Sequence, residues 1–267
     1  MKKTNKCNNL LRTKLLGLRI SNMLKVFQPR LDKLLDTNNK ELYDSLCKKM
    51  PIRLHYCTGK NYGVFICNGA ARIDIPVNNY SSASFAHELL HIQLSADYGV
   101  NVGGAIKLNR NGSKYLSAVI SDKLADHISN VLEHRKMFPI FIELGYDRTS
   151  FLSDYSPPVL TDEETSIFKA LFKERTTFFR SIPHEALDCY IGKYIAAKGA
   201  CIDAFDYSSQ LSEMYKIEPV LCAIMDSLIS RWDKYDEKRE GYPLDDTYHL
   251  IIYDFMNAME EWLKKHI

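Results

Sequence analysis

The stretch SFAHELLHIQL, residues 84–94, decides the fold and the chemistry that we expect of this chain. It places His87, Glu88 and His91 inside an apolar run with helical character. On an α-helix, residues four apart lie on one face, one turn apart along the axis. His87 and His91 can therefore present two imidazoles to one ion, with Glu88 about 100° around the helix from His87. The pattern predicts a metal site, and the alternative is a chance combination of residues.

The composition of the chain is that of a globular protein and gives no sign of a nucleic-acid-binding or membrane protein. The chain has 267 residues, of which 46% are hydrophobic and 25% charged, as in ordinary globular proteins. Its net charge of only +2 gives no reason to expect nucleic acid or a membrane as a partner. The basic N-terminus lacks the continuous apolar run of a signal peptide, and no segment approaches the ~18 apolar residues of a membrane span. These features predict a cytoplasmic protein.

The cysteines point to the same compartment. Their number is odd, and none of them forms a CxxC pair. This usage predicts reduced thiols. Cys57 and Cys67 could face each other across a hairpin, but we favour buried free thiols. The seven positions are Cys7, Cys47, Cys57, Cys67, Cys189, Cys201 and Cys222.

Hydrophobic periodicity divides the chain into a helical start, a short β region and a long helical remainder. Residues 9–50 have helical periodicity. After Pro51, the segments IRLHYC, YGVFICNG and ARIDIPV are short and rich in β-branched and aromatic residues. They predict three strands of a small antiparallel sheet. NNYSSAS then offers N-cap residues for the helix that contains HELLH, which we expect to stop near Gly99.

The remaining segments are predicted to be helical after one loop. NVGGAIKLNRNGS (101–113) is predicted to be that loop, followed by a helix from about Ser113 to Met137 that ends at Pro139. PIFIELGYD (139–147) predicts a short helical turn closed by Gly145. Thr161 and Glu164 have capping-box spacing at the start of a further series of helices.

The predicted fold class is therefore α+β and predominantly helical. We expect one compact molecule with three parts. These are an N-terminal helical segment (1–50), a core (51–150) and a C-terminal helical part (151–267) packed on the same core.

At the HELLH helix and the strand before it, the chain resembles the zincin superfamily of HExxH zinc metallopeptidases. The resemblance covers about residues 52–140. It implies a zincin-like core with a small antiparallel sheet and two active-site helices. It also implies a Zn²⁺ ion bound by His87 and His91, with Glu88 as general base. ARIDIPV would be an edge strand that pairs with the backbone of a peptide substrate.

A catalytic zinc site needs a third protein ligand. Metzincins extend the motif to HExxHxxGxxH, and here the corresponding positions hold Leu94 and Asp97, so this assignment is weak. Gluzincins use a glutamate on a following helix, which favours Glu133. Their second acidic residue, four positions later, is Met137 in this chain, so His134 stays almost equally plausible. We expect one of the two to bind the metal and the other to orient a histidine ligand.

A later segment offers groups for stabilising an oxyanion. Zincins often use a distal tyrosine or histidine for this purpose. Helix-packing aromatic residues are the alternative explanation. The candidates in IPHEALDCYIGKY (182–194) are His184, Glu185, Asp188, Tyr190 and Tyr194.

The resemblance implies a gluzincin-like zinc metallopeptidase that hydrolyses peptide bonds. Its substrate would be a peptide or protein, and a dedicated protein partner would explain the long helical part after residue 150. One alternative is a non-catalytic helical binding or regulatory module whose zinc site is structural or vestigial. Such a site could use both Glu133 and His134. A metal-free protein with an accidental motif is the third hypothesis.

Overall fold

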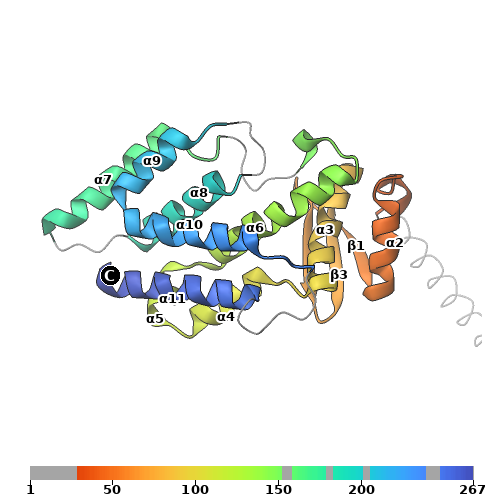
Figure 1. Cartoon of the computed structure of the whole chain (residues 1–267). Helices are drawn as coiled ribbons and strands as arrows, with labels where there is room; N and C mark the ends of the chain where they lie inside the picture. Colours follow the sequence, from red (N-terminus) through yellow and green to blue (C-terminus); the bar gives the residue numbers. More distant parts are fainter. Residues whose placement is uncertain (1–28, 152–157, 179–182, 201–204, 239–246, 267) are drawn as a thin grey trace, which may run out of the picture. The chain divides into compact units, whose positions relative to one another are not determined.

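The computed structural model describes residues 29–151, 158–178, 183–200, 205–238 and 247–266, without the side chains of 173–178 (Figure 1). The helix predicted for residues 9–28 lies outside these ranges, as do Cys7 and Cys201. The chain divides into two compact units between Ile92 and Gln93, within one helix. The boundaries expected near residues 50 and 150 stay predictions.

Helices dominate the described residues, and the predicted α+β class with a mostly helical chain is confirmed. The first unit contains a 3-10 helix (Leu31–Lys33), α2 (Lys40–Lys49), β1 (Ile52–Cys57), β2 (Gly63–Cys67), β3 (Ala70–Pro76) and most of α3 (Ser82–Tyr98). The second contains α4 (Val102–Asn111), α5 (Lys114–Val119), α6 (Asp122–Glu143), a 3-10 helix (Arg148–Ser150), α7 (Asp162–Phe178), α8 (His184–Lys198), α9 (Ser208–Ile217), α10 (Pro219–Lys234) and α11 (Tyr248–His266).

The three-stranded sheet is mixed, with the strand order β1-β3-β2. β2 and β3 form an antiparallel hairpin, whose turn residues Asn68 and Gly69 have φ of 50° and 70°. Positive φ at both turn positions is the type I′ conformation, which Asn-Gly favours. β1, however, runs parallel to β3. The predicted antiparallel sheet is therefore wrong for β1, because residue patterns identify strands but do not fix which strands pair.

β3 is the central strand and not the edge strand that the resemblance implied. It pairs with β1 on one side and β2 on the other, so its backbone is not available to a substrate. The physical reason is burial. Ile73 and Ile75 of β3 are 0% exposed, and a strand with neighbours on both sides buries such residues best.

The alternative in which Cys57 and Cys67 face each other across a hairpin does not occur. Their partners across the ladder are Pro76 and Ala70, at opposite ends of β3. The prediction of buried thiols holds only for Cys222 among the described cysteines, because Cys57 is half-buried and Cys47, Cys67 and Cys189 are exposed.

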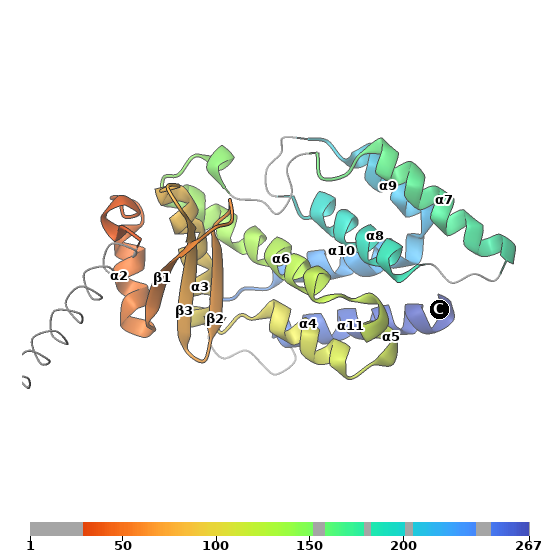
Figure 2. The same cartoon turned by 180° about the vertical axis from the view of Figure 1, so that it is seen from behind.

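α3 covers the apolar face of the sheet, and α2 lies beside it (Figures 1 and 2). The rings of Tyr43 on α2 and Phe85 on α3 are 5.8 Å apart. On the other face of the sheet, Arg53, Phe65 and Arg72 are exposed. One face is therefore apolar and helix-covered, while the other meets solvent.

Both ends of α3 are fixed as the sequence predicted. Ser81 caps the start, with its hydroxyl oxygen accepting from Ser84 N at 3.1 Å. At the other end Gly99 has a φ of +66° and its N–H donates to Ser95 O at 3.1 Å. A left-handed glycine that bonds back to the last turn is a common helix stop.

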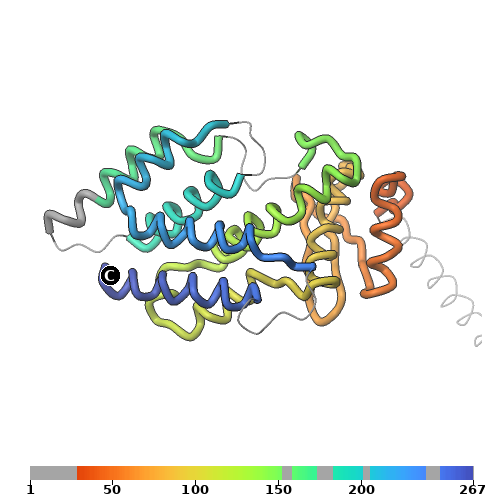
Figure 3. Tube along the Cα trace, in the orientation of Figure 1, coloured from red at the N-terminus to blue at the C-terminus, as the bar shows by residue number. Residues whose placement is uncertain are grey.

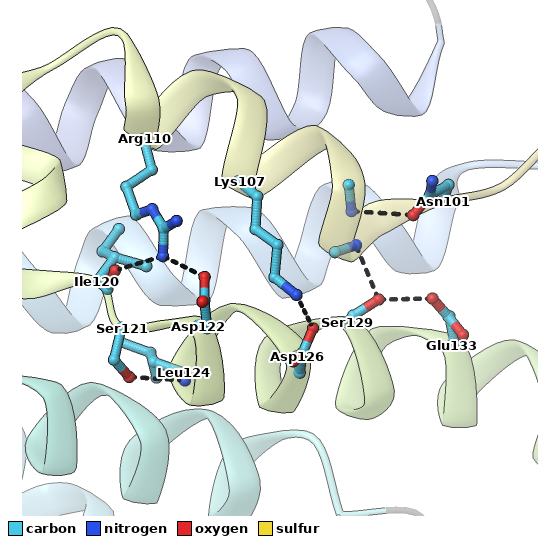
Figure 4. A network of polar contacts seen from close by, with 12 residues as sticks. Asn101, Lys107, Arg110, Ile120, Ser121, Asp122, Leu124, Asp126, Ser129 and Glu133 are labelled. Carbon is cyan, nitrogen blue, oxygen red and sulfur yellow. Dashed lines mark hydrogen bonds and ion pairs between the residues drawn. The ribbon is translucent and has the colours of Figure 1, made fainter. Parts of the chain in front are cut away.

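The predicted loop at 101–113 is wrong, because most of it forms α4. The Asn101 side chain caps this helix by accepting from Gly104 N at 2.9 Å. Gly103 lies against α6, where its N–H donates to Ser129 Oγ at 2.9 Å (Figure 4). Two adjacent glycines resemble a loop in sequence, yet here both lie in a helix, and the first bonds to the neighbouring helix.

The helix predicted to end at Pro139 instead continues to Glu143, and it begins only at Asp122. Ser121 caps it by accepting from Leu124 N at 3.0 Å, which separates α5 from α6. Proline removes one helical hydrogen bond, but packing can outweigh that loss. Phe138 and Phe141 flank Pro139, and both rings pack on Phe151 at 5.2 and 5.1 Å.

The predicted capping box at the start of α7 is confirmed. Thr161 N donates to Glu164 Oε2 at 2.9 Å, and Glu164 N donates to Thr161 Oγ1 at 3.2 Å. Within the second unit α6 packs against α4, α8 and α10, while α10 lies beside α11 (Figures 1 and 3). Among the described residues, no helix combines the length and apolar character needed to span a membrane.

Asn39 provides a test of how the first unit is held together. Its side chain is 0% exposed and donates to Leu34 O at 2.9 Å and Ser82 O at 3.1 Å. We expect Asn39→Ala to lower the free energy of unfolding by about 2–4 kcal/mol, because two carbonyls lose a donor. Urea denaturation measures this loss. The neighbouring Asn38→Ala should cost less than about 0.5 kcal/mol, and equal losses in the two variants would contradict the assignment.

Candidate metal centre

The HELLH segment lies in α3, and all three of its polar side chains are buried. His87, Glu88 and His91 are 3%, 4% and 8% exposed. The two imidazole centroids are 5.1 Å apart, in an edge-to-face arrangement. Charged and polar groups are rarely this deep unless they are hydrogen-bonded or bind a metal ion. The helix therefore places two potential ligands side by side, with a carboxylate next to them.

His134 lies in α6 and is 7% exposed. Its ring packs edge-on against Phe151, with centroids 5.3 Å apart. The same turn of α6 is anchored to α10, because Trp232 Nε1 donates to Leu132 O at 2.6 Å. Arg135, next to His134, forms two hydrogen bonds of 2.6 Å with the carboxylate of Asp233.

A third anchor lies one residue further along α6. The Lys136 ammonium pairs with Glu237 at 3.2 Å and also donates to Tyr235 O. These contacts join the turn that carries His134 to the C-terminal end of α10. Several bonds therefore fix the turn of α6 that carries His134.

Three buried histidines, His87, His91 and His134, could hold a metal ion, since their ligand atoms lie within 4.8 Å of one another. Nitrogens bound tetrahedrally to zinc at about 2.0–2.1 Å are about 3.3 Å apart, a difference that small side-chain rotations can close. Three protein ligands with one open position are typical of catalytic zinc sites. Imidazole also suits copper, iron and nickel, so the donor set alone does not identify the metal.

Glu133, the other candidate for the third ligand, is not a member of this group. It accepts from Ser129 Oγ at 2.6 Å, and Ser129 in turn binds Gly103 of α4 (Figure 4). One turn earlier, Asp126 pairs with Lys107 of α4 at 2.5 Å. The side of α6 that carries Asp126 and Glu133 therefore packs against α4. That His134 binds the metal stays a prediction, as does a role for Glu133.

The metzincin positions do not join the group either. Leu94 is an apolar core residue, 2% exposed, and Asp97 lies half-buried near the end of α3.

The proposed oxyanion candidates in 182–194 lie among the helices of the second unit. Tyr190 donates to Met214 O at 2.7 Å, and Tyr194 donates to Asp226 Oδ1 at 2.9 Å. Burial raises the pKa of both hydroxyls above the ordinary range. Asp188 accepts from Ser121 N at 3.3 Å. These contacts describe helix packing, the alternative explanation for this segment. His184 is half-buried, and Glu185 is exposed.

Tyr62 is a buried residue that bonds to the segment before α3, and no sequence pattern indicated it. Its ring is 8% exposed, and its hydroxyl donates to Asn79 O at 2.6 Å and accepts from Ser81 N at 3.0 Å. Burial raises the pKa of Tyr62, and the negative charge of Glu88 adds to this effect. A tyrosine in the turn-like stretch GKNYG has no pattern that predicts such contacts.

No protein family, curated protein or solved structure matches the chain. The resemblance to zincins therefore depends on the HELLH motif and its surroundings. The zincin-like core stays a prediction, and the mixed sheet with a central β3 departs from it.

Metal analysis of purified protein tests the site. We expect about one zinc ion per chain in the wild type, and its loss in His87→Ala and His134→Ala, because three ligands are needed. Glu133→Gln should retain the ion. His127→Ala is a matched control, since this α6 histidine contacts Gly192 O at 3.1 Å and is not a member of the group.

Two results would change the assignment. Zinc retained in His134→Ala but lost in Glu133→Gln would make Glu133 the ligand. A wild type that takes up no zinc, even when zinc is supplied, would make HELLH a coincidence.

Proposed function

We propose that this protein is a zinc-dependent metallopeptidase in which His87, His91 and His134 bind the ion and Glu88 is the general base. One observation carries the proposal. The ligand atoms of the two histidines of an HExxH helix lie within 4.8 Å of one another and of those of a third buried histidine, and the glutamate of the motif is also buried. The donor set fits a catalytic zinc ion, because it supplies three imidazoles and leaves a position open.

A zinc ion at this position supplies a Lewis acid that makes water more acidic and polarises a peptide carbonyl. The chain's own contribution is to hold that ion and to move a proton. Glu88 accepts a proton from the attacking water and passes it to the amine that leaves. Because Glu88 is only 4% exposed, bulk water competes little for that proton.

The sheet supports a peptide as the substrate class. An extended peptide can add to a sheet by pairing with an unpaired strand edge. β3 is paired on both sides, so within the described sheet such a peptide would add to β1 or β2. The helices after residue 150 would supply a recognition surface for a dedicated protein substrate.

The coordination count argues against the structural-zinc alternative. A structural zinc site normally has four protein ligands. Among the described residues the group has three members, and Glu133, the fourth residue that this alternative needs, bonds to Ser129. The catalytic proposal is therefore the one that the donor set supports best.

Substitution of the general base tests the mechanism. We expect Glu88→Gln to retain one zinc ion and to lose at least ~10³-fold in turnover, because glutamine cannot accept the proton. The assay incubates wild type and variant with a diverse peptide library and identifies new termini by mass spectrometry. His127→Ala is the control and should cleave normally, because this histidine is not a member of the group. A zinc-loaded Glu88→Gln variant with substantial turnover would disprove this role for Glu88.

A further inference from the structure

We propose that Tyr62 is a positioning residue that fixes the first turn of α3 and thereby the direction of the Glu88 carboxylate. The inference rests on the proposed function, because it concerns the group that serves there as general base. It assigns Tyr62 no contact with substrate. Its hydroxyl acts through the backbone and through Ser81.

The Tyr62 hydroxyl is hydrogen-bonded to the segment that leads into α3. The hydroxyl donates to Asn79 O at 2.6 Å and accepts from Ser81 N at 3.0 Å. The hydroxyl is therefore a donor to one neighbour of Tyr80 and an acceptor from the other. Since the ring is 8% exposed, the hydroxyl is held in place by the surrounding core.

Ser81 is in turn hydrogen-bonded to the first turn of α3. Ser81 Oγ accepts from Ser84 N at 3.1 Å and from the Ser84 hydroxyl at 3.0 Å. Ser81 O accepts from Phe85 N at 2.9 Å. The N-cap that Tyr62 holds thus fixes the whole first turn of the helix.

The first turn of α3 is followed, one turn later, by the general base. Glu88 lies four residues after Ser84, on the same side of α3. Side chains on a helix point back towards its N-terminus, so a residue at the position of Glu88 projects towards the turn that contains Ser84.

Tyr43 of α2 provides a matched control, because it packs against the first turns of α3. Its ring contacts Phe85 with centroids 5.8 Å apart, while burial, together with Cys47 of its own helix, raises the pKa of its hydroxyl. Tyr43→Phe therefore removes a hydroxyl from a tyrosine that packs on α3 without touching the hydrogen bonds at the start of that helix.

The test measures binding of acetohydroxamic acid to the zinc-loaded full chain by calorimetry. This probe chelates zinc through two oxygens and gives up a proton, which a nearby carboxylate accepts. We expect Glu88→Gln to weaken its binding. Tyr62→Phe should weaken it by ~10-fold while keeping one zinc ion, as loss of an orienting contact typically does. Tyr43→Phe should bind it like the wild type.

Each result leads to a different conclusion. Unchanged binding in a zinc-loaded Tyr62→Phe, with weakened binding in Glu88→Gln, overturns the role of Tyr62 and leaves the proposed function standing. A wild type without zinc, or a Glu88→Gln variant that binds the probe normally, overturns the proposed function and this inference with it. Equal weakening in Tyr43→Phe also overturns the inference, because the effect would then be general destabilisation.

A second variant covers the case in which Tyr62→Phe does not fold. Ser81→Gly removes the hydroxyl that joins the N-cap to Ser84, while glycine is accepted at N-caps at a cost of only a few tenths of a kcal/mol. It should weaken acetohydroxamic acid binding in the same direction as Tyr62→Phe. Normal binding in zinc-loaded Ser81→Gly would overturn the proposal.

Discussion

Burial of polar side chains on α3 is the constraint on which the rest of this structure depends. His87, Glu88 and His91 lie among core residues with almost no contact with solvent. An apolar environment makes unpaired polar groups costly, so these side chains need partners that the fold supplies. A sheet covers one side of the helix, a capped first turn fixes its rotation, and a third histidine completes a donor set that could hold a metal ion.

The contacts that hold α3 and the turn of α6 around His134 in place come from several parts of the chain, and not only from the HELLH motif. The start of α3 is held by Asn39 and Tyr62, which both bond to the backbone near Ser81. The turn of α6 around His134 is held by bonds to the end of α10, among them the two that join Arg135 to Asp233. Such supporting contacts matter because metal and proton transfer chemistry tolerate little misplacement of the reacting groups.

The predictions that failed share a physical cause. The segment with Gly103 looked like a loop, and the one with Pro139 looked like a helix end, because both residues disfavour helices in isolation. In the folded chain, the Gly103 N–H bonds to Ser129 of α6, and the rings of Phe138 and Phe141, near Pro139, pack on Phe151. Strand pairing failed for a related reason, since β1 and β3 meet only through a long-range arrangement that no local pattern contains.

By itself, the sequence determined the elements whose signals are local. These include the mostly helical α+β class, an N-cap for α3 within NNYSSAS and its stop near Gly99. They also include the i, i+4 histidine pair of α3, because helix geometry places such residues together wherever the helix forms. The surroundings of the neighbours Glu133 and His134, by contrast, are visible only in the tertiary structure. They lie about 100° apart on α6, and packing against α4 engages the glutamate, while the histidine joins the group with His87. Which side of a helix meets which partner is a property of the packed molecule, because adjacent residues on one helix differ only in direction.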